Sequence, residues 1–205
     1  MDIAVAATTF ALIIPVELPD KTFIASLVLA TRYRPFPVWV GVSAAFLVQS
    51  LVAVTAGGLV SLLPEEAVAT AAGLLFAVGA ALLWRGARTA DADEAEEERE
   101  FEARATEPLH GWRAAAASFG VLFLAEWGDL SQLLTAGLAA RYDAPVEVFA
   151  GSWLALVVVA GLAVVSGRAL LRVVRLGTIR RVGAGLCLVL ALVAAYDVVR
   201  SLVTG

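Results

Sequence analysis

The sequence has very few of the side chains that build soluble catalytic centres or thiol and imidazole metal sites. Its 205 residues include one cysteine, Cys187, one histidine, His110, and one lysine, Lys21. A single cysteine excludes an intramolecular disulfide, and one histidine with one cysteine cannot build the usual zinc, copper or haem sites. No Ser-His-Asp or Cys-His set can be assembled. We therefore expect neither an enzyme nor a bound cofactor.

Charged residues are also scarce, at 17% of the chain, whereas hydrophobic residues make up 60% and the mean hydropathy is +0.86. Soluble domains average about a quarter charged residues, and the apolar runs here are longer than a soluble core of this size could bury. The net charge of −4 argues against a basic face for nucleic acid. The composition predicts a multi-pass protein of the lipid bilayer and leaves a homo-oligomer open.

Six apolar segments are each long enough to cross about 30 Å of hydrocarbon as a helix that rises about 1.5 Å per residue. Transmembrane strands would alternate apolar and polar residues, and these segments do not. The sequence therefore predicts an all-α membrane protein with six transmembrane helices. They would cover residues 3–31, 37–63, 67–84, 112–140, 145–170 and 182–203.

An acidic stretch separates the first three segments from the last three. Residues 91–107 hold nine acids against two arginines, which predicts a hydrophilic and partly helical linker; a cation-attracting or regulatory loop is the alternative. The chain then divides into a three-helix repeat at 1–90, an acidic linker at 91–111 and a second three-helix repeat at 112–205.

The distribution of arginine predicts how the chain lies in the membrane. Twelve of the 14 arginines fall in the odd-numbered loops, and only Arg141 and Arg200 fall on the opposite side. Because positive residues favour the cytoplasmic side, we expect the acidic linker in the cytoplasm and both termini outside. This topology would suit a plasma or inner cell membrane.

The chain also repeats itself at an offset of 109 residues. The matched positions are Glu17 with Glu126, Asp20 with Asp129, Thr22 with Ser131, and Arg32-Tyr33 with Arg141-Tyr142. Because each half holds an odd number of spans, the second half would enter the membrane from the opposite side. Such an inverted repeat is the plan of many secondary transporters, which place their site near the bilayer midplane where the repeats meet.

Five charged side chains fall near the middle of the first and fourth predicted spans. At a helix centre, each costs about 2.5–3.5 kcal/mol on the milder insertion scales, so all five would be expensive without partners or a purpose. They are Glu17, Asp20, Lys21, Glu126 and Asp129.

The spacing of these acids predicts one cluster. Acids three residues apart share a helix face, and the repeat would bring two such faces together. Four carboxylates and one ammonium sum to −3, a charge that repels itself in low dielectric unless protons or a cation are bound. An all-oxygen cage suits Ca²⁺, Mg²⁺ or Mn²⁺, and Thr22, Ser131 and Gln132 could add neutral oxygens. A structural salt bridge through Lys21 is the alternative.

Helix-breaking residues lie inside both motifs. Pro15 and Pro19 flank Glu17, and Gly128 precedes Asp129. Because proline removes a backbone hydrogen bond, we expect either a simple kink or an unwound segment that offers carbonyl groups to an ion, as in the broken helices of transporters.

The sequences Glu-Leu-Pro-Asp-Lys-Thr at 17–22 and Glu-Trp-Gly-Asp-Leu-Ser-Gln at 126–132 resemble the paired signature Glu-x-Gly-Asp-(Lys/Arg)-(Thr/Ser) of the GDT1 family, also called UPF0016. The resemblance covers essentially the whole chain. It implies an antiporter that exchanges Mn²⁺ or Ca²⁺ for protons at the motif acids. By this similarity, the metal would be bound by Glu17, Asp20, Glu126 and Asp129, supported by Lys21, Thr22, Ser131 and Gln132.

Two residues depart from the family pattern. Pro19 stands where the first motif has glycine, and Leu130 stands where the second has a basic residue. The second departure leaves one cation in the site and makes it more acidic than the pattern.

We therefore predict a secondary transporter that exchanges a divalent cation, Mn²⁺ first and Ca²⁺ second, for protons and exports the cation from the cytoplasm. Two other functions stay open. One is an exporter of small organic cations or amino acids that pairs the same acids with an amine. The other is a membrane scaffold that transports nothing and whose acids hold helices together.

Overall fold

The computed structural model describes residues 2–18, 21–104, 109–166 and 176–204. Over these ranges the regular secondary structure is helical throughout, which confirms the all-α class. The helices are α1 (Ile3–Glu17), α2 (Lys21–Arg32), α3 (Pro35–Val60), α4 (Glu65–Gly86), α5 (Ala90–Arg104), α6 (Trp112–Ala125), α7 (Leu130–Tyr142), α8 (Pro145–Ser166) and α10 (Leu176–Thr204).

Four helices, α3, α4, α8 and α10, contain a stretch long and apolar enough to cross a membrane. A fifth span arises if α1 and α2 count as one segment that bends by 70°. The predicted first span, 3–31, is therefore not one continuous helix, and neither is the predicted fourth span, 112–140, which divides into α6 and α7. Both interruptions fall at the motif acids, where charged side chains oppose a straight helix packed in apolar surroundings.

The helices follow the repeat seen in the sequence. The start of α6 comes 109 residues after that of α1, and the start of α7 comes 109 residues after that of α2. Both halves of the chain therefore hold a short helix, an interruption at the acids, a second short helix and two long helices.

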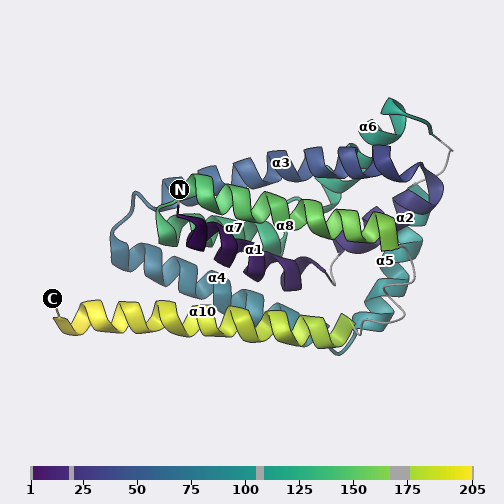
Figure 1. Cartoon of the computed structure of the whole chain (residues 1–205). Helices are drawn as coiled ribbons and strands as arrows, with labels where there is room; N and C mark the ends of the chain where they lie inside the picture. The colour runs from purple at the N-terminus through teal and green to yellow at the C-terminus, as the bar shows by residue number, and fades with distance from the viewer. Residues whose placement is uncertain (1, 19–20, 105–108, 167–175, 205) are drawn as a thin grey trace.

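In each half of the chain, one long helix packs against the first helix of the other half. The first half's α3 packs along α6, and the second half's α8 packs along α1 (Figure 1). A side chain at Gly41 would place its Cβ 2.1 Å from the Ala115 carbonyl oxygen, and one at Gly151 would place it 2.3 Å from that of Ala6. Because Ala6 and Ala115 are themselves repeat partners, glycine permits the same close backbone crossing twice.

The acidic linker is more ordered than a tether. Residues 90–104 form α5, which packs against α2, and the Phe101 side chain is buried in the hydrophobic core. The predicted partial helix is thus observed, but the acidic composition did not predict that Phe101 would attach it to the core.

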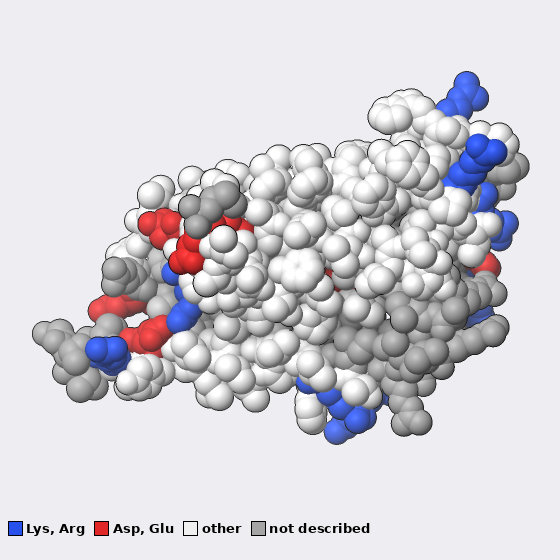
Figure 2. All heavy atoms as spheres, in the orientation of Figure 1, with Lys and Arg blue, Asp and Glu red and all other residues white. Residues whose placement is uncertain are grey.

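Charge is concentrated at the two ends of the elongated bundle. On the face that Figure 2 shows, the visible acids lie mostly at one end and the Lys and Arg side chains mostly toward the other, with an almost uncharged flank between them; the acidic helix α5 lies at the arginine-rich end (Figure 1). Both chain ends lie at the end of the bundle opposite α5 (Figure 1). An apolar flank between polar ends is the surface that a bilayer requires.

Candidate functional site

The first acid of the site ends a helix. Glu17 is the last residue of α1, and its side chain is completely buried. Pro15 lies inside α1 without ending it, and the Leu18 backbone N–H donates to the Ile14 carbonyl oxygen at 2.9 Å to close the last turn. The chain direction then changes before α2, so Glu17 lies at the bend of the α1–α2 pair.

The second motif forms a turn between α6 and α7. Glu126 caps the C-terminal end of α6 and is 2% exposed, whereas Asp129 caps the N-terminal end of α7 and is half-buried. Between them, Gly128 has a φ of +80°, a conformation that glycine adopts without steric cost. The two acids were expected on one face of a continuous helix; they instead face each other across this turn.

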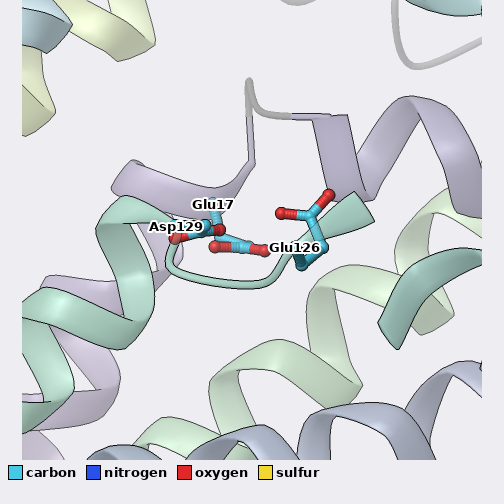
Figure 3. A group of neighbouring side chains, drawn as sticks. All are labelled: Glu17, Glu126 and Asp129. Atoms are coloured by element: carbon cyan, nitrogen blue, oxygen red, sulfur yellow. The ribbon is translucent and has the colours of Figure 1, made fainter. Parts of the chain in front are cut away.

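The turn and the end of α1 bring three carboxylates together. Glu17, Glu126 and Asp129 each offer an oxygen atom, and these three atoms lie within 4.8 Å of one another (Figure 3). The acids come from both halves of the chain, as the repeat predicts. Three converging carboxylates in an apolar bundle match the oxygen ligands that hard divalent cations prefer.

Two neighbouring polar side chains hold the turn in shape. The Ser131 backbone N–H donates to Asp129 Oδ1, and its hydroxyl donates to Asp129 Oδ2 at 3.4 Å. Gln132 Oε1 accepts a hydrogen bond from the Gly128 backbone N–H at 2.9 Å. Ser131 and Gln132 therefore stabilise the turn of the second motif, and the Gln132 oxygen that was expected to face an ion accepts the Gly128 hydrogen bond instead.

The remaining residues of the first motif are described in part. Asp20 and Pro19 lie outside the described residues, as does the side chain of Lys21. The Thr22 side chain is completely buried, and its hydroxyl has no hydrogen-bond partner among the described residues. Thr22 thus offers a buried polar oxygen one helical residue into α2.

Leu130, which replaces the basic residue of the family signature, packs against α4. Its Cδ1 atom lies 3.0 Å from where a Cβ on Gly79 would be. A glycine on the facing helix thus makes room for this leucine. The apolar contact explains how the second motif accommodates Leu130, which adds no charge to the acids.

Gln49, a polar residue of the apolar helix α3, lies beside the site. Its Nε2 atom donates to the Phe123 carbonyl oxygen at 3.2 Å, in the last turn of α6. The last four carbonyl groups of a helix lack partners within it, so Gln49 satisfies one of them just before Glu126. Gln49 lies near the middle of α3.

Comparison with known proteins accords with this geometry. A family model described as "Divalent cation/proton antiporter GDT1" matches residues 5–91 and 114–201. The two matched stretches begin 109 residues apart, which is the offset of the internal repeat, and each contains one motif.

Individual relatives point to the same family. A GDT1-like protein of Synechocystis is 35% identical over 160 residues, covering 74% of this chain and 77% of the relative. A Vibrio cholerae protein named "Putative manganese exporter" is 32% identical over 198 residues, covering 95% of this chain and 90% of the relative. The chloroplastic protein PAM71 of Arabidopsis thaliana is 31% identical over 214 residues, covering 94% and 57%. No solved structure matches the chain.

Proposed function

Because this chain belongs to the GDT1 family of divalent cation/proton antiporters, we propose that it exchanges Mn²⁺ for protons across a cell membrane and exports the metal from the cytoplasm. The observation that carries the proposal is the convergence of Glu17, Glu126 and Asp129 within an apolar bundle. The similarity to a relative that is named as a manganese exporter supports Mn²⁺ as the first candidate. Ca²⁺ is the second candidate, since it too prefers carboxylate oxygens.

The proposed site uses the acids of both motifs. Glu17, Glu126 and Asp129 would ligate the transported ion, with Asp20 as a fourth ligand by its equivalence to Asp129. Thr22 and Lys21 would complete the first motif, while Ser131 and Gln132 would hold the second in shape. Glu17, Glu126 and Asp129 each lie at a helix end, so small movements of the helices would change the distances between these ligands.

We further propose that the protein forms two inverted repeats of three spans. The α1–α2 and α6–α7 pairs would then be the broken first and fourth spans, and their acids would meet near the bilayer midplane. The arginine distribution supports a cytoplasmic acidic linker with both termini outside. In this arrangement, alternating access follows when one half rocks against the other around the carboxylates.

Exchange follows from competition for the same oxygens. A hard divalent cation that arrives from one side of the membrane offsets two of the three clustered negative charges. After its release, protons must take its place, because like charges so close together repel each other in low dielectric. Metal and protons therefore occupy the site alternately, which couples their movements in opposite directions.

Metal-dependent proton flux in proteoliposomes tests the proposal. We expect an imposed Mn²⁺ gradient to drive proton movement in the opposite direction, with Ca²⁺ and Mg²⁺ compared at equal concentration. Glu17→Gln and Glu126→Gln should each abolish this flux, because each removes a ligand and a proton acceptor together. Glu66→Gln is the matched control, since Glu66 is exposed in the first turn of α4.

Other outcomes of this experiment point to the alternative functions. A flux driven by organic amines and insensitive to Mn²⁺ would contradict the metal proposal and favour an amine exporter. Absence of any coupled flux from a folded protein, with the glutamine variants less stable than the parent, would favour the scaffold.

A further inference from the structure

An open apolar groove lies on the flank of the bundle, between the first turns of α3 and the second half of α8. Its volume is about 590 Å³, within the range of about 300–1,000 Å³ that is typical of small-molecule sites. The two helices come from different halves of the chain and pack against each other. Its lining residues are Pro35, Phe36, Trp39, Val157, Val158, Gly161, Leu162, Val164 and Val165.

The groove exists because Gly161 on α8 has no side chain to fill it and because the Trp39 side chain on α3 is held in place by a hydrogen bond. A Cβ on Gly161 would lie 3.3 Å from the Trp39 Nε1 atom, so the glycine leaves space beside the indole. The same Nε1–H donates to the Val157 carbonyl oxygen at 3.1 Å. This hydrogen bond holds the tryptophan across the seam, so the groove is built into the packing and does not depend on a loop.

Two exposed arginines come directly before the residues that line one end of the groove. Pro35 and Phe36 line the groove at the start of α3, and exposed Arg34 and Arg32 come directly before them in the chain. At the position 109 residues after Arg34, the second half has Asp143 instead. The repeat equivalent of this corner therefore keeps one arginine, Arg141, and has an acid in place of the other.

We propose that this groove binds an anionic phospholipid, with an acyl chain along Gly161 and Trp39 and the phosphate at Arg32 and Arg34. The groove is apolar, and Arg32 and Arg34 come just before the residues that line one end of it. This combination matches a molecule with a hydrocarbon tail and an anionic head. Arginine suits phosphate, because its planar guanidinium can donate two parallel hydrogen bonds. A lipid seated here contacts both halves of the chain and bridges the seam between α3 and α8.

Fluorescence quenching by brominated lipids tests this site, because Trp39 forms its wall. The protein is reconstituted into bilayers of phosphatidylcholine with increasing fractions of brominated phosphatidylglycerol, or of brominated phosphatidylcholine as the reference. Subtracting the signal of a Trp39→Phe variant isolates the quenching of Trp39. We expect phosphatidylglycerol to be favoured by about fivefold for each arginine that contacts its phosphate, the effect of about 1 kcal/mol per cation near a membrane surface.

Two pairs of variants separate the lipid site from general attraction. The double variant Arg32→Gln/Arg34→Gln should bind the two lipids about equally. The double variant Arg88→Gln/Arg113→Gln should keep the preference for phosphatidylglycerol. Val158→Phe should fill the groove and lower the quenching of Trp39 by both lipids. Leu154→Phe, on the same helix but outside the groove, should not.

Three results would overturn the proposal, each measured on protein that elutes as a folded species. The first is equal quenching of Trp39 by the two brominated lipids. The second is a preference for phosphatidylglycerol that persists without Arg32 and Arg34. The third is Trp39 fluorescence that depends on protein concentration and not on lipid, which would show that a second copy of the chain covers the groove.

Discussion

At the scale of single residues, the turn between Glu126 and Asp129 depends on Gly128. Its φ of +80° lies in the left-handed region, and no atom of the described residues, apart from its own chain neighbours, lies within 4 Å of the position that a Cβ would take. A side chain there would therefore meet no neighbour, and its cost would come from the backbone alone.

We expect Gly128→Ala to lower the free energy of unfolding by about 1–2 kcal/mol, the usual cost of the left-handed conformation. The same strain should weaken Mn²⁺ binding, because relaxing the turn moves Glu126 away from Asp129. Thermal unfolding and Mn²⁺ titration of the purified protein measure the two effects. Gly120→Ala is the control, since Gly120 is within helix α6 with nothing near its Cβ position, and alanine there should stabilise the helix. Equal effects at the two positions would contradict the role given to Gly128.

Gln132 fixes the same turn through a hydrogen bond. Replacing it with leucine leaves the Gly128 N–H without its acceptor, which typically costs about 1 kcal/mol. We expect Gln132→Leu to raise the dissociation constant for Mn²⁺ by roughly fivefold, the equivalent of that energy. Gln132→Glu keeps an acceptor at the same place and should restore tight binding; if both variants bind like the parent, the hydrogen bond does not position the ligands.

The identities of the acids could be predicted from sequence, but their surroundings could not. Glu17, Glu126 and Asp129 are conspicuous because charge is rare in apolar segments. Leu130 contacts Gly79, which lies about 50 positions earlier in the chain, and no motif or periodicity in the sequence predicts this contact. Gln49 was visible as a polar residue in an apolar helix, but its partner is a backbone carbonyl, which the sequence does not distinguish.

At the scale of helices, the helix-breaking residues predicted a kink or an unwound segment at each motif, whereas hydrophobicity alone predicted unbroken spans. Apolar content averaged over 3–31 and 112–140 predicts continuous spans, because two acids barely change the mean of a long window. Pro15 was a plausible breaking point, yet α1 continues through it and ends at Glu17. In the second motif, the break is defined by the left-handed Gly128 and by the Asp129 cap, features that belong to the turn and not to hydrophobic periodicity.

The crossing of α3 and α6 gives a sharp test at this scale. We expect Gly41→Ala to destabilise the protein by about 1–3 kcal/mol or more, the usual range for overpacking, since its Cβ would collide with the Ala115 backbone. Gly58→Ala, in the same helix but with nothing within 4 Å, should be neutral or slightly stabilising. Unfolding of both variants in the same detergent measures the difference. Comparable stability would show that the two helices do not approach as closely as the structure indicates.

At the scale of the whole molecule, the internal repeat explains why the ligands come from distant parts of the chain. The 109-residue offset was readable from the sequence, and it recurs in the helix starts and in the crossings at Ala6 and Ala115. What the offset could not reveal is the exchange of partners, in which α3 packs along α6 and α8 along α1. That exchange places the end of α1 beside the α6–α7 turn and so assembles one cluster from two motifs.

The repeat is also incomplete in ways that matter for function. Arg34 corresponds to Asp143 and Lys21 to Leu130, so the two ends and the two motifs differ in charge. The two halves therefore share one helix arrangement but differ in charge, both beside the acids and at the ends of the bundle.

Mn²⁺ binding measured together with proton release decides whether the three carboxylates form the exchange site. Purified protein is titrated with Mn²⁺ in weakly buffered solution at several pH values, while free Mn²⁺ is followed by electron paramagnetic resonance and pH by an indicator. Because ligands must lose their protons to bind metal, we expect each bound Mn²⁺ to release protons and affinity to rise with pH. Glu17→Gln and Glu126→Gln should each weaken binding at least tenfold and release fewer protons, with Glu66→Gln unchanged. Mn²⁺ binding of parental strength in both glutamine variants, or binding without proton release, would contradict the assignment.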